Sequence, residues 1–144
     1  MSAAVQTIEI DAPVETVYAV IVDYGRYPEF LPEIENAEVV QRDGDTVDVQ
    51  FSLNLIKRLT YTLRLVGEPD RGVSWTLVEG MFQTNDGGWN LEALDGGRTR
   101  ATYRIEVAVG VFVPGSITKR LVGSTLPTTL AAFKARAEEA HAAG

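Results

Sequence analysis

The feature of this sequence that most constrains its fold is an amphipathic helical pattern over residues 114–141, which follows a long run of alternating segments. Apolar side chains recur three to five positions apart and form one stripe, made of Ile117, Leu121, Leu126, Leu130, Phe133 and Ala137. A helix of about 28 residues is about 42 Å long, and its apolar stripe needs another layer to cover it. The pattern therefore predicts a long helix that lies across a sheet.

The middle of the chain is predicted to form that sheet. Five turn signals divide it into short segments, at residues 43–44, 54–58, 69–72, 85–88 and 95–97. Between these turns apolar side chains alternate with polar ones, most clearly over residues 100–109. Short connections join antiparallel neighbours, and a strongly twisted sheet of this size curls. We therefore expect a curved antiparallel sheet wrapped around the long helix, with a cavity where side chains leave the space between them unfilled.

The first 32 residues are predicted to add one strand and two short helices. Residues 6–10 alternate briefly, and Asp11, Pro13 and Glu15 mark the start of a helix that runs to about Val22. A second short, aromatic helix is expected over residues 26–32, where two prolines limit its length. The prediction is an α+β fold with a curved antiparallel sheet of about seven strands around a long C-terminal helix, with two short helices after strand one, in a single domain over residues 1–144.

Composition limits the function. The chain has 144 residues, no cysteine and a formal net charge of -7, which disfavours nucleic acid as a partner. His141 is the only histidine and lies near the end of the predicted helix, so neither a metal site nor a serine–histidine–aspartate arrangement inside the core is expected. No cofactor is predicted. A signal-like first segment and long apolar runs are both missing from the sequence, so we expect a cytoplasmic protein.

Four aromatic residues are candidates for a ligand-binding surface. Tyr61, Trp75, Trp89 and Tyr103 share strand parity with aliphatic neighbours, so their rings are expected on the concave face of the sheet. Core packing explains each of them singly, whereas together they would also suit a flat or isoprenoid ligand. The full predicted lining adds neighbours on the same strand faces and on the long helix: Tyr61, Leu63, Trp75, Leu77, Trp89, Leu91, Tyr103, Ile105, Ile117, Leu121 and Thr125.

Glu79 is the one weak candidate for a catalytic residue. It shares parity with Trp75 and Leu77, which would point its carboxylate inward just before Gly80. Buried without a partner, such a carboxyl group would have a raised pKa and would serve as an acid or base. A bulge at the strand end would instead turn Glu79 outward, and both alternatives stay open at this stage.

Several local strings resemble the START-like superfamily, also called the helix-grip or SRPBCC group. These strings are IDAPVETVY at residues 10–18, DYGRYPEFLP at 23–32, GWNL at 88–91 and TRATY at 99–103. Within the superfamily the chain is most similar to the polyketide cyclase/dehydrase and coenzyme-Q-binding branch. The resemblance covers nearly the whole chain and implies a hydrophobic cavity between the sheet and the C-terminal helix.

The resemblance implies binding or carriage of a quinone, an isoprenoid or another lipid, with no catalytic residue needed. The alternative is a polyketide aromatase/cyclase or dehydrase, although no catalytic set of that group maps onto matching positions here. Some relatives in the branch are ribosome-associated toxins, and the charge of -7 disfavours that third interpretation. The oligomeric state expected is a monomer or a homodimer.

An entrance to the cavity is also predicted. Pro127 cannot donate to the carbonyl of Gly123, so the long helix should bend or loosen at residues 123–125. We expect this bend to frame the entrance together with residues 112–115 and 27–32, although a helix curved merely to fit its sheet is an equal alternative. Residues 53–58 form an apolar loop with two cations that suits transient membrane contact, and a buried hairpin end explains the same residues.

Overall fold

The structure is a computed structural model that describes residues 2–55, 57–111 and 113–144. Its strands are β1 (Ser2–Ile10), β2 (Ile34–Asp43), β3 (Thr46–Asn54), β4 (Arg58–Glu68), β5 (Gly72–Gly80), β6 (Phe82–Leu94) and β7 (Arg98–Val109). Its helices are α1 (Val14–Val22), the 3₁₀ helix η1 (Tyr24–Glu29), α2 (Ser116–Lys119), the π-helical turn η2 (Arg120–Ser124) and α3 (Leu126–Ala143). The predicted α+β class is confirmed.

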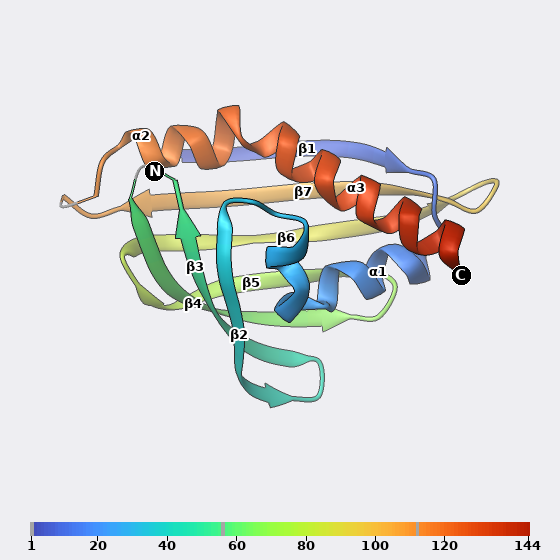
Figure 1. The fold of residues 1–144 in the computed structure, drawn as a ribbon, viewed down its shortest axis with the longest axis horizontal. Helices are drawn as coiled ribbons and strands as arrows, with labels where there is room; N and C mark the ends of the chain where they lie inside the picture. The colour runs from blue at the N-terminus through green and yellow to red at the C-terminus, as the bar shows by residue number, and fades with distance from the viewer. Residues whose placement is uncertain (1, 56, 112) are drawn as a thin grey trace.

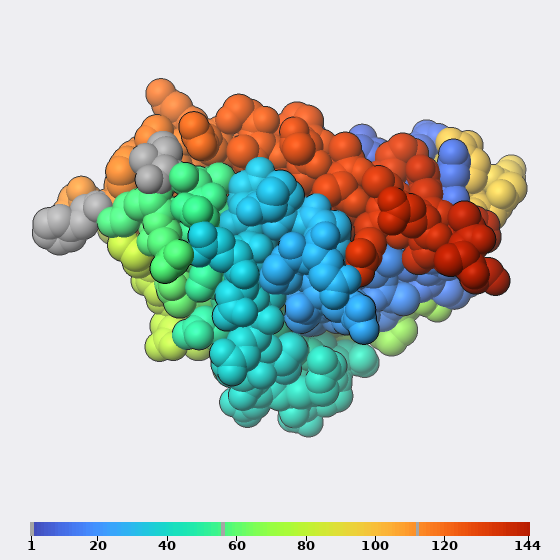
Figure 2. Space-filling view, in the orientation of Figure 1, coloured from blue at the N-terminus to red at the C-terminus, as the bar shows by residue number. Residues whose placement is uncertain are grey.

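The seven strands form one antiparallel sheet in the order β1-β7-β6-β5-β4-β3-β2. The sheet curls, and the C-terminal helical segment runs along it on the same side as α1 and η1 (Figure 1). In the space-filling view this segment covers one edge of the visible face, with the chain from α1 to β2 packed beside it (Figure 2). The long-helix-across-a-curved-sheet prediction is therefore confirmed.

One of the five predicted turns is wrong. Residues 85–88 lie inside strand β6, and the reversal between β5 and β6 occurs instead at Gly80 and Met81. Gly80 has a φ of 135°, which favours glycine, and a Cβ there would lie 2.5 Å from the Cβ of Tyr61. The other four turn positions fall between strands as expected.

The glycines in β6 serve close packing rather than a turn. A Cβ on Gly87 would lie 2.3 Å from the carbonyl oxygen of Arg104 and 2.6 Å from the ring of Trp75. A Cβ on Gly88 would lie 2.6 Å from the carbonyl oxygen of Val73. Only glycine leaves room for these approaches, so a signal typical of turns appears here within a strand.

The C-terminal helical segment loosens near the predicted bend. Residues 120–124 form a π-helical turn, in which the Thr125 N–H donates to the Arg120 carbonyl at 3.0 Å, five residues back. Pro127 lies in the first turn of α3, where its missing N–H costs least. The proline therefore begins a new helix instead of continuing the previous one.

Hydrogen bonds from α3 to the end of β1 and the residue after it hold this helix against the sheet. Glu138 accepts a hydrogen bond from the Asp11 backbone N–H at 2.8 Å and one from the Lys134 ammonium at 2.6 Å. Lys134 also donates to the Glu9 carbonyl at 2.8 Å.

Among the described residues, none of the helices has both the length and the apolar character needed to cross a bilayer.

Candidate functional site

A cavity of about 130 Å³ lies between the concave face of the sheet and the C-terminal helical segment. Its walls come from α1, η1, the start of β2, strands β3 to β7, η2 and α3. Apolar and aromatic side chains dominate this lining, which is the usual composition of a small-molecule site. The cavity is therefore the candidate functional site.

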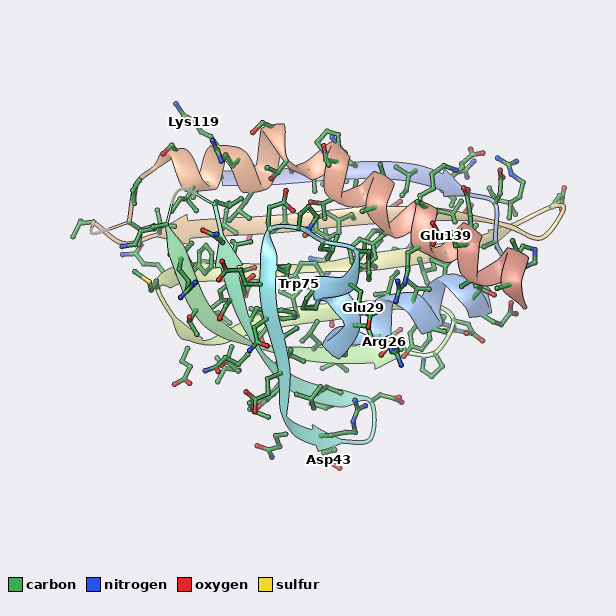
Figure 3. The ribbon with its side chains drawn as sticks, in the orientation of Figure 1. Arg26, Glu29, Asp43, Trp75, Lys119 and Glu139 are labelled. Carbon is green, nitrogen blue, oxygen red and sulfur yellow. The ribbon has the colours of Figure 1, made fainter. Side chains whose placement is uncertain are left out.

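The structure brings eight of the eleven predicted lining residues around this cavity: Tyr61, Leu63, Trp75, Trp89, Tyr103, Ile105, Leu121 and Thr125. Figure 3 shows Trp75 in the interior of the molecule, whereas Lys119 on α2 points outward. The two tryptophans of the chain both line the cavity, so their fluorescence reports on anything that binds there.

Three predicted residues lie away from the lining. Leu91 is buried near the other end of β6, where it faces Ala101 across the strand pair. Leu77 is half-buried on the part of β5 that pairs with β4 alone, and Ile117 is fully buried in the core. Strand or helix parity places all three on the inner side, but the cavity occupies only part of that side.

Glu79 does not point into the cavity. The pairing of Thr62 with Glu79 and of Leu63 with Leu77 leaves Val78 as an extra residue in β5. This bulge reverses the parity after Leu77, so Glu79 is exposed. The inward alternative for Glu79 is therefore wrong and the outward alternative is confirmed.

Trp75 and Asn85 form a side-chain hydrogen bond within this apolar lining. The Trp75 Nε1–H donates to Asn85 Oδ1 at 3.1 Å, and Asn85 is only 4% exposed. Backbone pairing between β5 and β6 stops at Trp75 and Gly87, so this side-chain bond joins the strands just beyond the last backbone pair. Asn85 was missed from sequence because it falls in the segment predicted as a turn.

Three aromatic residues of the lining, Tyr27, Phe51 and Phe133, were not among the predicted site residues. Phe133 on α3 contacts Trp89, Tyr27 and Phe30 edge-on, with ring centroids 5.1 to 5.3 Å apart. Tyr27 also stacks on Phe51 at 5.9 Å. Tyr27 and Phe51 line the cavity, and their signals were the short aromatic helix and the alternation of β3.

The tyrosines in the wall keep their protons. Burial raises the pKa of Tyr27, of Tyr61 and of Tyr103. The Tyr27 hydroxyl donates to the Ile21 carbonyl at 2.6 Å. Because their pKa values are raised, these hydroxyls act as neutral hydrogen-bonding groups at physiological pH and do not act as anionic bases.

Most of the half-buried lining residues lie where η2 and α3 face β2 and the end of β3: Glu33, Ile34, Leu55, Leu121, Thr125 and Thr129. Partial exposure of lining residues indicates that the cavity opens there. The predicted bend of the helix is thus at the opening. Phe112 of the predicted entrance loop lies outside the described residues.

The end of the β3–β4 hairpin has two environments, because its leucines line the cavity whereas Asn54 and Arg58 are exposed. Leu53 is buried and lines the cavity together with Leu55, and Arg58 pairs with Glu35 at 2.7 Å. Ile56 of this loop lies outside the described residues. The buried-hairpin alternative accounts for Leu53 and Leu55, and membrane contact stays a prediction.

Across the described part of the chain, histidine, cysteine and carboxylate side chains do not gather in groups of three or more that would hold a metal ion. The cavity lining contains one carboxylate among the described residues, that of Glu33. The arrangement is thus an apolar chamber with aromatic walls, neutral hydroxyls and one buried amide.

Comparisons with known proteins agree with this geometry. The model of the family described as "Polyketide cyclase / dehydrase and lipid transport" matches residues 10–134. Among curated proteins, the Ribosome association toxin RatA of Vibrio cholerae serotype O1 is 30% identical over 96 residues, or 64% of this chain. The match spans 65% of that relative, just under two thirds of its length.

Solved structures share the fold at low sequence identity. A START superfamily protein from Mycobacterium smegmatis has a TM-score of 0.82 at 22% identity, over 95% of this chain and 97% of that one. The Zhui aromatase/cyclase from a Streptomyces species has a TM-score of 0.79 at 18% identity, over 96% of this chain and 93% of that one. These similarities establish a START-like fold and leave the activity to be argued from the site.

Proposed function

This chain belongs to the polyketide cyclase / dehydrase and lipid transport family, and from that membership we propose that it binds and carries a hydrophobic small molecule in the cavity. The observation that carries the proposal is a chamber walled by apolar and aromatic side chains, beneath a helix that loosens at the opening. Transfer of an apolar molecule from water into such a chamber is favourable without any catalytic group.

The size of the cavity limits what it encloses. Its volume of about 130 Å³ is close to that of an engineered cavity of about 150 Å³ that holds benzene. One ring therefore fits inside, whereas a long isoprenoid tail does not. A quinone with such a tail would place its head group in the chamber and its tail through the opening at Leu121 and Thr125.

Identification of the natural ligand is the first experiment. The protein is purified from its own host, examined by native mass spectrometry and extracted with organic solvent. A retained quinone, isoprenoid or acyl lipid supports carriage. An aromatic polyketide favours the second candidate function, and a protein that neither retains nor takes up any apolar molecule contradicts the proposal.

A matched pair of variants tests whether the cavity is the binding site. Thr129 lines the cavity and Thr128, its neighbour on α3, is exposed. Thr129→Phe places a ring in the chamber, so uptake of a small aromatic probe, followed by tryptophan quenching, should fall at least tenfold. Thr128→Phe should leave uptake unchanged, and equal affinity in both variants would place the binding site elsewhere.

The second candidate is a polyketide cyclase or dehydrase, in which a cavity tyrosine hydroxyl would donate a proton. The observation in its favour is that Tyr61 and Tyr103 line the cavity, with pKa values that keep them protonated. In this case Tyr61→Phe or Tyr103→Phe should abolish turnover and spare binding. If the protein binds polyketides but converts none of them, the carrier function is the one supported.

The ribosome-associated relative suggests a third test. The net charge of -7 opposes contact with an RNA phosphate backbone. We therefore expect this protein to remain in the supernatant when ribosomes are sedimented, including at low salt, where such contacts are strongest.

A further inference from the structure

The side chain of Asn85 has a polar group that the fold itself does not use. Asn85 is only 4% exposed, and it lines the cavity. Its Oδ1 faces the Trp75 Nε1–H at 3.1 Å. An indole nitrogen only donates, so the atom facing it must be the amide oxygen, and the orientation of the amide is fixed by chemistry.

The amide nitrogen is consequently turned away from Trp75. Over residues 2–55, 57–111 and 113–144, no hydrogen bond joins Asn85 Nδ2 to another protein group. Among the described residues, Tyr24 Oη is the side-chain polar atom that is fully enclosed and lacks a hydrogen-bond partner. Asn85 Nδ2 does not belong to that class, so it retains some accessible surface. Asn85 Nδ2 therefore has no protein partner and is not fully enclosed. Because Asn85 is buried and lines the cavity, we infer that this nitrogen faces the cavity.

Joining the strands does not explain this amide. The bond across the end of the β5–β6 pairing needs only an acceptor for the indole, and a threonine or serine hydroxyl would also accept. The second half of the amide, a two-hydrogen donor, is left in an apolar chamber. A buried donor without a partner is costly, so a ligand that accepts from it gains more than it would from water.

We propose that the ligand carries a carbonyl or similar acceptor oxygen on its ring, which accepts a hydrogen bond from Asn85 Nδ2. The inference rests on the proposed function, and it narrows the ligand from any apolar molecule to a ring carbonyl compound such as a quinone or an aromatic ketone. Trp75 is the positioning residue, because its indole holds the amide with the donor toward the cavity.

The aromatic wall suits such a ligand. The rings of Trp75 and Tyr103 lie 5.5 Å apart, and those of Trp89 and Tyr103 lie 5.0 Å apart. A flat ring placed against them contacts large apolar faces while its oxygen points toward the β5–β6 junction. The Gly87 position leaves the space that lets Trp75 reach Asn85.

Two probes of the same shape test the inference. Acetophenone carries a carbonyl where α-methylstyrene carries a methylene group, and each is a single ring of the size that the cavity holds. Binding of both is measured by tryptophan quenching in the wild type, in Asn85→Leu and in Asn90→Leu. The last is the matched control, because Asn90 lies on the same strand with its side chain exposed.

The comparison between probes cancels differences in their hydration. Asn85→Leu should weaken acetophenone about tenfold, the range of a single buried hydrogen bond, and should change α-methylstyrene by less than twofold. Asn90→Leu should change neither. Equal effects of Asn85→Leu on the two probes would overturn the inference while leaving the carrier function intact, whereas saturable binding of neither probe by the wild type would overturn both.

A measurement on the wild type guards against an Asn85→Leu variant that does not fold. The side-chain amide of Asn85 is observed by ¹⁵N–¹H NMR during titration with each probe. Acetophenone should move one amide proton resonance downfield and α-methylstyrene should not. Equal shifts with both probes, or no shift with acetophenone although it binds, would contradict the proposed contact.

Discussion

Gly87→Ala tests whether the site depends on the close approach of β5, β6 and β7. The added Cβ would lie 2.3 Å from the Arg104 carbonyl oxygen and 2.6 Å and 2.9 Å from two atoms of the Trp75 ring. All three distances are shorter than real contacts of a Cβ allow. The carbonyl belongs to the β6–β7 ladder and the ring to the cavity wall, so relief requires a shift of backbone or of Trp75.

The expected loss follows from three terms. Overpacking of a well-packed interior costs about 1–3 kcal/mol, and loss of the Trp75–Asn85 hydrogen bond costs about 1 kcal/mol. Replacing glycine by alanine restricts the unfolded chain and returns about 0.5–1 kcal/mol. The free energy of unfolding should thus fall by about 2 kcal/mol, which corresponds to a melting temperature lower by about 4–8 °C.

Urea unfolding followed by tryptophan fluorescence measures this loss. Gly25→Ala is the control, because a Cβ there meets nothing within 4 Å and the residue has no positive φ. The control should change stability by less than about 0.5 kcal/mol. A Gly87→Ala variant as stable as the control, with unchanged near-ultraviolet circular dichroism from Trp75, would refute the packing argument.

Three further predictions concern the opening and the titrating groups. Pro127→Ala restores a donor for the Gly123 carbonyl and should slow release of a bound aromatic probe several-fold in stopped-flow experiments, and an unchanged rate would separate the bend from ligand exchange. Burial raises the pKa of all five tyrosines above the usual value of about 10, so ultraviolet titration of the native protein should show tyrosinate at higher pH than in urea. The stabilisation linked to these raised pKa values is complete below pH of about 10 and is lost as the pH rises through the folded values. The hydrogen bond from Arg64 lowers the pKa of Asp48, so this pair stabilises the fold above pH of about 4 and less as the pH falls; urea midpoints of wild type and Asp48→Asn should therefore converge in acid, and parallel profiles would contradict the pairing.

Local chemistry in the sequence determined most of the architecture. The period-two pattern and four of the five turn signals identified strands in their correct places, because side-chain alternation and turn residues act over a few neighbouring positions. Pro127 likewise indicated the loosened helix, since the missing N–H is a property of the residue itself. The strings at residues 10–32 and 88–103 identified the family.

The tertiary structure decided which of these residues make the site. The bulge at Val78 reverses the strand parity and turns Glu79 to the surface, and nothing in the local sequence distinguishes it from a regular strand. Gly87 and Gly88 imitate a turn, although their missing side chains accommodate Trp75 and the neighbouring strand. Asn85 became visible as a site residue only when that strand was placed. Parity and propensity are properties of one segment, whereas a cavity, a bulge and a fixed amide arise where several segments meet.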